Sequence, residues 1–73
     1  MSVYKIIFAR NKAMSCQVVK EQIKLQGAYS YEHDKGNLIY ALVVADNEEH
    51  AMSMGDAIVK EVTDKVFGSD FIN

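Results

Sequence analysis

The sequence has no proline, no tryptophan, only four glycines and a single cysteine among its 73 residues. Because proline is missing and glycine is scarce, no segment is typical of a linker, and we expect one small domain over residues 1–73. The lone Cys16 excludes a disulfide within the chain, whereas small secreted domains commonly depend on several. Lys5 and Arg10 interrupt the first apolar residues, which therefore do not resemble a secretory signal. We expect a cytoplasmic protein.

Long apolar runs and an excess of basic residues are also missing. No run approaches the roughly 20 residues of a membrane-spanning helix, so we predict no contact with a membrane. The net charge is −2, which argues against nucleic acid as the partner, because domains that bind it are usually basic. With 49% hydrophobic and 25% charged residues, the chain has the composition of a folded domain, which excludes a disordered one.

Residues 3–9, "VYKIIFA", are rich in β-branched and aromatic types and predict a first strand. Successive side chains of a strand point to opposite faces. The face that carries Tyr4, Ile6 and Phe8 is wholly apolar, so we expect it to meet the main core.

Residues 12–26 predict a first helix, because their apolar side chains fall on two adjacent stripes while lysines occupy the opposite side. Asn11 is a suitable N-cap, since its side-chain oxygen can accept a free backbone N–H. Gly27 is a suitable end, since glycine adopts positive φ readily.

Two strands joined by the turn "DKGN" follow, at residues 28–33 and 38–45. Their register depends on the turn. A two-residue turn at Lys35 and Gly36 pairs Tyr31 with Tyr40. A three-residue turn with a bulge pairs Tyr31 with Ile39 instead, and we favour it because it spares Lys35 a positive φ.

The strongest helix signal comes next. Asp46 is the expected N-cap, and Glu49 three residues later completes a capping box. The helix carries one apolar stripe, formed by Ala51, Gly55, Ile58, Val62 and Val66. Glycine within a helix costs about 1 kcal/mol relative to alanine, so we expect a close approach at Gly55. Gly68 ends the helix, and the residues after it are either a tail or a short fourth strand through Phe71 and Ile72.

The order strand, helix, strand, strand, helix predicts an α+β fold, a ferredoxin-like βαββα(β) plait with a mostly antiparallel sheet and two helices on one face. Residues 38–45 are apolar on both sides, and two helices cover only one side. We therefore expect an exposed apolar sheet face, which usually marks an interaction surface. Its expected residues are Val3, Ile7, Ile39, Ala41 and Val43, with Tyr29 and Tyr31 beside them.

From this face we predict a non-enzymatic protein-binding or regulatory module: an adaptor, an inhibitor or an assembly subunit. The expected partner is a protein, and we favour a second copy of the chain, a homodimer, because two sheets commonly pack face to face. The alternative function is an anion or nucleotide sensor, in which Arg10, Asn11 and Lys12 surround the start of the predicted first helix.

A third possibility is a single-strand nucleic-acid binder that stacks bases on Phe8, Tyr29, Tyr31 and Tyr40, although interleaved basic residues are missing. Soft metal ligands are few, namely Cys16, His33 and His50, and their spacing matches no zinc pattern. We therefore predict no metal, no cofactor and no catalytic residue.

Overall fold

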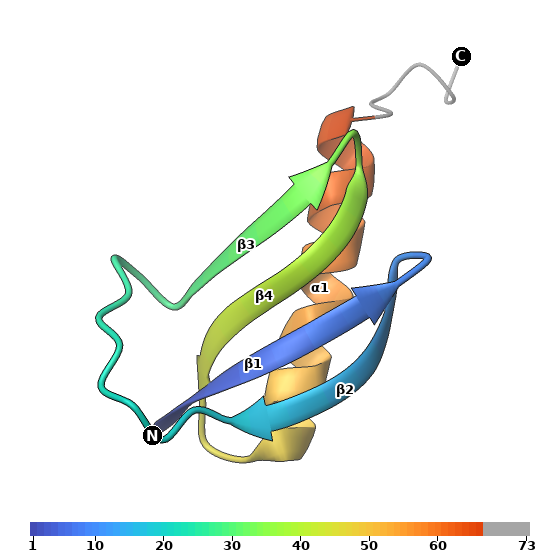
Figure 1. Ribbon diagram of the computed structural model, residues 1–73. Coiled ribbons are helices and arrows are strands. Elements are labelled where there is room, and N and C mark those ends of the chain that lie inside the picture. The colour runs from blue at the N-terminus through green and yellow to red at the C-terminus, as the bar shows by residue number, and fades with distance from the viewer. Residues whose placement is uncertain (67–73) are drawn as a thin grey trace.

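The computed structural model describes residues 1–66, and within them the chain forms four strands and one helix (Figure 1). In chain order they are β1 (Ser2–Ala9), β2 (Lys12–Val18), β3 (Tyr29–Asp34), β4 (Asn37–Ala45) and α1 (Glu48–Val66). The expected helix end at Gly68 and the possible strand through Phe71 and Ile72 lie outside the described residues.

The four strands form one antiparallel sheet in the order β2-β1-β4-β3. The helix α1 packs on one face, which we call the covered face, and Figure 1 views the sheet from the opposite, open face. An α+β fold is confirmed. The ferredoxin-like plait with two helices on one face is wrong, because residues 12–26 do not form a helix.

These residues instead form strand β2 and the start of an irregular connection. Arg10 and Asn11 both adopt positive φ, 53° and 58°, and reverse the chain so that β2 pairs with β1. Asparagine tolerates this conformation well, so Asn11 marks a turn here and not a helix cap. Ser15, Cys16, Gln17 and Val18 alternate between polar and apolar, which suits a strand as well as a helix over so short a run.

The β3–β4 hairpin differs from both predicted registers. Its two-residue turn holds Lys35 and Gly36 at positive φ, 52° and 90°, as the tight hairpin turns require. A bulge then leaves Ile39 without a partner in β3, so that Tyr31 pairs with Ala41. Lys35 therefore adopts the positive φ that we expected it to avoid, and that expectation is wrong.

The covered face carries the core, and β1 contributes to it as predicted through the buried Ile6 and Phe8. Ile6 pairs with Ala41, and paired residues share a face, so Ala41 belongs to the core as well. Within residues 1–66 the core consists of Ile6, Phe8, Leu38, Ala41, Val43, Ala45, Ala51, Ile58 and Val62.

The predicted stripe of α1 is confirmed for its first four residues, Ala51, Gly55, Ile58 and Val62, all of which are buried. A Cβ atom at Gly55 would lie 3.1 Å from Cδ1 of Ile6. The close approach predicted at Gly55 is thus made by strand β1.

The predicted cap of α1 was shifted by one residue. Asn47, not Asp46, accepts the His50 N–H through its Oδ1 atom at 2.8 Å. In return, Nδ1 of His50 accepts the backbone N–H of Asp46 at 3.1 Å. The pair resembles a capping box in which histidine replaces the expected Glu49.

Candidate protein-binding surface

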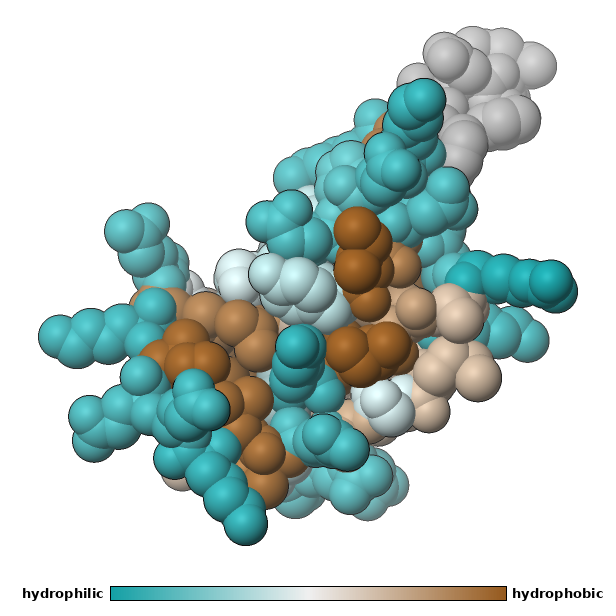
Figure 2. Space-filling view, in the orientation of Figure 1, coloured by the Kyte–Doolittle hydropathy of each residue, from teal (hydrophilic) through white to brown (hydrophobic). Residues whose placement is uncertain are grey.

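The open face of the sheet is the first candidate site, because α1 covers only the other side. Residues that alternate with the core face outward here, among them Val3, Lys5 and Ile7 of β1. Figure 2 views the molecule from this side and shows apolar side chains in two groups, one at the lower left and one near the centre. The two groups have different surroundings.

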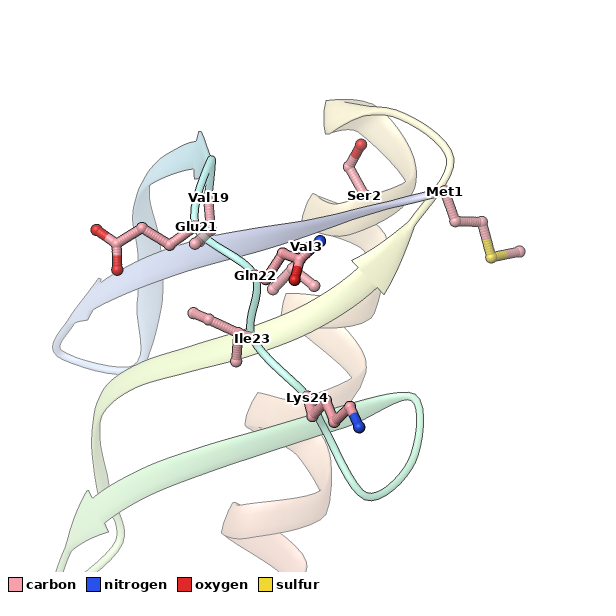
Figure 3. A pocket seen from close by; sticks show the side chains of 8 residues that line it. All are labelled: Met1, Ser2, Val3, Val19, Glu21, Gln22, Ile23 and Lys24. Atoms are coloured by element: carbon pink, nitrogen blue, oxygen red, sulfur yellow. The ribbon is translucent and has the colours of Figure 1, made fainter.

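Residues 19–28, which we call the crossing segment, pass over one end of the sheet on the way from β2 to β3. The segment is fixed at both ends by backbone hydrogen bonds of 2.8 Å, from Val19 N to Val3 O and from Val44 N to Ala28 O. Its side chains at Val19, Ile23 and Leu25 are half-buried. Figure 3 shows this segment in front of the β1 and β4 strands.

The chain thereby shelters part of its own open face. Val3, Leu42 and Val44 are half-buried, although no helix lies over them. An open hollow of about 460 Å³ remains beside the segment, lined by Met1, Ser2, Val3, Val19, Glu21, Gln22, Ile23 and Lys24. The charged ends of Glu21 and Lys24 point to different sides in Figure 3, so the hollow gathers no set of polar groups.

Beyond the crossing segment, the large apolar side chains of Ile7, Met14 and Ile39 are 40%, 65% and 52% exposed. Ile7 pairs with Ser15 on one side and with Tyr40 on the other. Met14 directly precedes Ser15 in β2, and Ile39 directly precedes Tyr40 in β4. Ile7, Met14 and Ile39 therefore lie at about one level across the three adjacent strands. We call them the apolar strip.

Tyr40 lies within the same level of the sheet and is half-buried. The ammonium group of Lys5 stands 5.2 Å from the centre of its ring, a favourable cation–π contact. A cation and an aromatic ring therefore border the apolar strip on the side of the crossing segment.

The predicted interface residues divide into three groups. Ile7 and Ile39 are exposed in the apolar strip, whereas Val3 lies beside the crossing segment. Ala41 and Val43 were placed on the wrong face, because both are fully buried beneath α1. The pairing of β1 with β4 reverses the predicted faces of residues 41–45.

Tyr29 and Tyr31 also lie on the covered side, beyond the reach of the open face. Their hydroxyls donate to the two carboxylate oxygens of Glu61 at 2.5 Å and 3.0 Å. Their rings are stacked, with centroids 6.2 Å apart. Lys65 Nζ lies 3.7 Å from Glu61 Oε2, and the two residues form an ion pair one turn apart on α1.

These phenols hold the charged carboxylate in place. Their hydrogen bonds, that of Tyr29 first, lower the pKa of Glu61 below its ordinary value. The same contact raises the pKa of the Tyr29 phenol. A small apolar hollow of about 100 Å³ lies next to the pair, lined by Tyr29, Met54, Ala57, Ile58 and Glu61. We interpret the cluster as a support that fastens β3 to α1.

The predicted anion site at Arg10, Asn11 and Lys12 loses its physical basis, because no helix begins there. The Asn11 side chain is also engaged: it donates to Gly36 O and accepts from Leu38 N, both at 2.9 Å. It therefore joins the β1–β2 turn to the β3–β4 turn.

The stacking platform is likewise absent. Phe8 is buried, and Tyr40 lies on the face opposite Tyr29 and Tyr31.

The soft metal ligands lie apart, in β2, at the β3–β4 turn and in the first turn of α1. His33 accepts the Gly36 N–H through Nδ1 at 3.2 Å. Cys16 is half-buried, and its burial, followed by the charge of Glu48, raises the pKa of the thiol. Residues 1–66 hold no group of three histidine, cysteine, aspartate or glutamate side chains that could bind a metal.

Two residues of this surface, Met14 and Tyr40, were not predicted. Met14 was assigned to a helix stripe, and only the pairing of β2 with β1 reveals it as an extra, exposed residue. Tyr40 was assigned to a stacking platform. In the sequence, the available signal was that Ile39 and Tyr40 are neighbours in a strand, which normally place their side chains on opposite faces. This signal does not locate the bulge at Ile39.

Among the described residues, no helix has the length and apolar character that crossing a membrane demands. Comparison with known proteins gives no match to a family model, to a curated protein or to a solved structure.

Proposed function

We propose that the protein is a binding module that recognises another protein through the apolar strip. The observation that carries the proposal is the exposure of Ile7, Met14 and Ile39 at one level of a sheet whose other end the chain covers itself. Exposed apolar side chains that lie together on a small domain commonly mark a contact surface. Such a module acts as an adaptor, an inhibitor or an assembly subunit, and we place the interaction in the cytoplasm.

A different protein suits this surface better than a second copy. In a symmetric dimer both copies present the same patch, so Lys5 and Lys12 of each copy would enter one interface. Like charges that face each other across an interface cost affinity. Three exposed side chains also offer far less than the roughly 800 Å² per partner of a standard interface. The strip therefore suits the centre of a small, transient contact.

The proposal is tested by affinity capture from an extract of cells that produce the protein. The variants Ile7→Ser and Ile39→Ser shorten exposed side chains of the strip and should each remove the same captured protein. Val18→Ser is the matched control, because Val18 is 47% exposed but pairs with Tyr4, a residue of the covered face. Thermal melts of all variants establish that each one is folded.

Two outcomes would contradict the proposal. In the first, the strip variants capture the same proteins as the wild type. In the second, light scattering shows a doubled mass at high concentration that Ile39→Glu returns to the mass of one chain. This second result would replace the heterologous partner with the homodimer that was predicted from the sequence.

A further inference from the structure

Four cations surround the apolar strip, and three of them belong to the two hairpin turns. Arg10 and Lys12 lie at the β1–β2 turn, and Lys35 lies at the β3–β4 turn. Lys5 completes the set from the middle of β1, where it stands over Tyr40. All four side chains are exposed. We call Lys5, Arg10, Lys12 and Lys35 the basic rim.

The turns are held together by Asn11, so the grouping of charges is a property of the fold. Asn11 follows Arg10 and precedes Lys12, and its amide donates to the carbonyl of Gly36, the residue after Lys35. Its oxygen accepts from Leu38 N, which fixes the same side chain to the first part of β4. Two turns that are far apart in sequence thus present their cations at one end of the sheet.

This end of the sheet differs in charge from the rest of the chain. Two carboxylates lie near the rim, Glu32 opposite Tyr40 and Asp34 beside the β3–β4 turn. The four cations of the basic rim and these two carboxylates sum to a charge of +2, whereas the whole chain has −2. The remainder of the chain therefore carries −4, and the positive charge is concentrated around the exposed apolar side chains.

From this arrangement we propose that the strip and its basic rim receive an acidic segment of another protein that carries apolar side chains. This proposal rests on the proposed function and names the chemistry of its partner. The apolar side chains of the segment contact Ile7, Met14 and Ile39, while its carboxylates lie near the rim. Complementary charge of this kind speeds association and selects among partners.

Other anionic partners fit the surface less well. Nucleic acid binds to aromatic platforms and to larger basic areas, whereas this strip is aliphatic and Glu32 and Asp34 border it. Membrane-binding surfaces commonly carry tryptophan or phenylalanine. The sequence has no tryptophan, and Phe8, the phenylalanine within residues 1–66, is buried.

The test uses three short fluorescent peptides and the full chain, with binding followed by fluorescence anisotropy. In the first peptide glutamate alternates with leucine, in the second lysine alternates with leucine, and in the third glutamate alternates with serine. We expect the first to bind at least tenfold more tightly than the others. Its affinity should fall several-fold when salt rises from about 50 to about 300 mM, because salt screens exposed charges.

Charge-reversal variants connect this result to the rim. The double variant Lys5→Glu/Lys12→Glu should weaken binding of the first peptide about tenfold or more. The control is Lys20→Glu/Lys60→Glu, which changes the net charge equally at positions outside the rim and should leave binding within twofold. Adding Ile7→Ser to the rim variant or to the control variant should weaken binding of the first peptide further.

The outcomes separate the two proposals. Equal binding of both leucine peptides, weakened by Ile7→Ser, would overturn the acidic partner and keep the binding strip. Equal binding of the serine and leucine versions of the acidic peptide would overturn the strip itself. If vesicles with anionic lipid, or a single-stranded oligonucleotide, bind while no peptide does, the acidic protein segment is wrong. If nothing binds, the acidic segment is also wrong, and the capture experiment alone decides the proposed function.

Discussion

The side chain of Asn11 donates a hydrogen bond to Gly36 O, 25 residues further along the chain, and accepts one from Leu38 N, both at 2.9 Å. These two side-chain hydrogen bonds join the β1–β2 turn to the β3–β4 turn. Its own backbone is at a φ of 58°, so the residue serves the turn and the connection at once.

We predict that removing this side chain costs about 1–3 kcal/mol of the free energy of unfolding, since the partners on the second hairpin are partly buried. Asn11→Gly removes both hydrogen bonds but keeps the positive φ at no steric cost. Asn11→Ala should be less stable still, because alanine is strained there. Urea denaturation measures both values. A wild-type midpoint for Asn11→Gly would show that the two hydrogen bonds contribute nothing.

The contact between Gly55 and Ile6 leads to a second prediction. Alanine at position 55 gains about 1 kcal/mol of helix propensity but places Cβ near Ile6 Cδ1, at 3.1 Å. Ile6→Val removes that Cδ1 atom and should itself cost about 0.5–1.5 kcal/mol. Gly55→Ala should therefore be more favourable in the Ile6→Val background than in the wild type. A thermodynamic cycle of the four proteins measures this coupling, and additive effects would contradict the close approach.

The phenol–carboxylate cluster predicts a dependence of stability on pH. The folded-state pKa of Glu61 is lowered, so the unfolded chain binds the proton more readily. The contribution of Glu61 is therefore present above its ordinary pKa of about 4.5 and is lost as pH falls through the lower, folded value. Carbon-13 NMR titration of the Glu61 carboxyl should show a pKa below the ordinary value. In Tyr29→Phe it should rise toward that value, and an unchanged pKa would show that the phenol is not its main cause.

The assignment of faces in β4 predicts opposite results for two glutamate substitutions. Val43 is fully buried beneath α1, and an unpaired carboxylate there should unfold the protein or cost more than about 4 kcal/mol. Ile39 is 52% exposed, so Ile39→Glu should change stability by less than about 1 kcal/mol. Circular dichroism melts compare the two variants directly. A folded Val43→Glu protein would show that Val43 faces the solvent, as was predicted from the sequence.

The sequence was sufficient for β1 and α1 because each has one clear period. The alternation of Tyr4, Ile6 and Phe8 and the spacing of Ala51, Gly55, Ile58 and Val62 both place one apolar side against the core. Over residues 12–18 the apolar side chains fit both periods. The deciding feature is the tight turn at Arg10 and Asn11, where positive φ occurs without glycine.

Exposed side chains at Ile7 and Ile39 were predicted, and both are exposed. Their role in an interface stays a prediction. The other positions could not be derived, because they depend on the bulge and on the pairing of β4 with β1, which are tertiary properties. Residues 19–26 of the crossing segment were predicted to be helical, so the cover that this segment gives to part of the open face was not predictable from the sequence.

The two bulges have a consequence for assembly. In the described part of the chain, the outer edges of β2 and β3 have no neighbouring strand, and such edges invite polymerisation. One bulge lies at Met14 within edge strand β2, and the other lies at Ile39 beside β3. A bulge bends and twists a strand pair, which removes the long straight border that fibre growth requires. The irregularities that expose two side chains of the strip thus also discourage the chain from stacking into filaments.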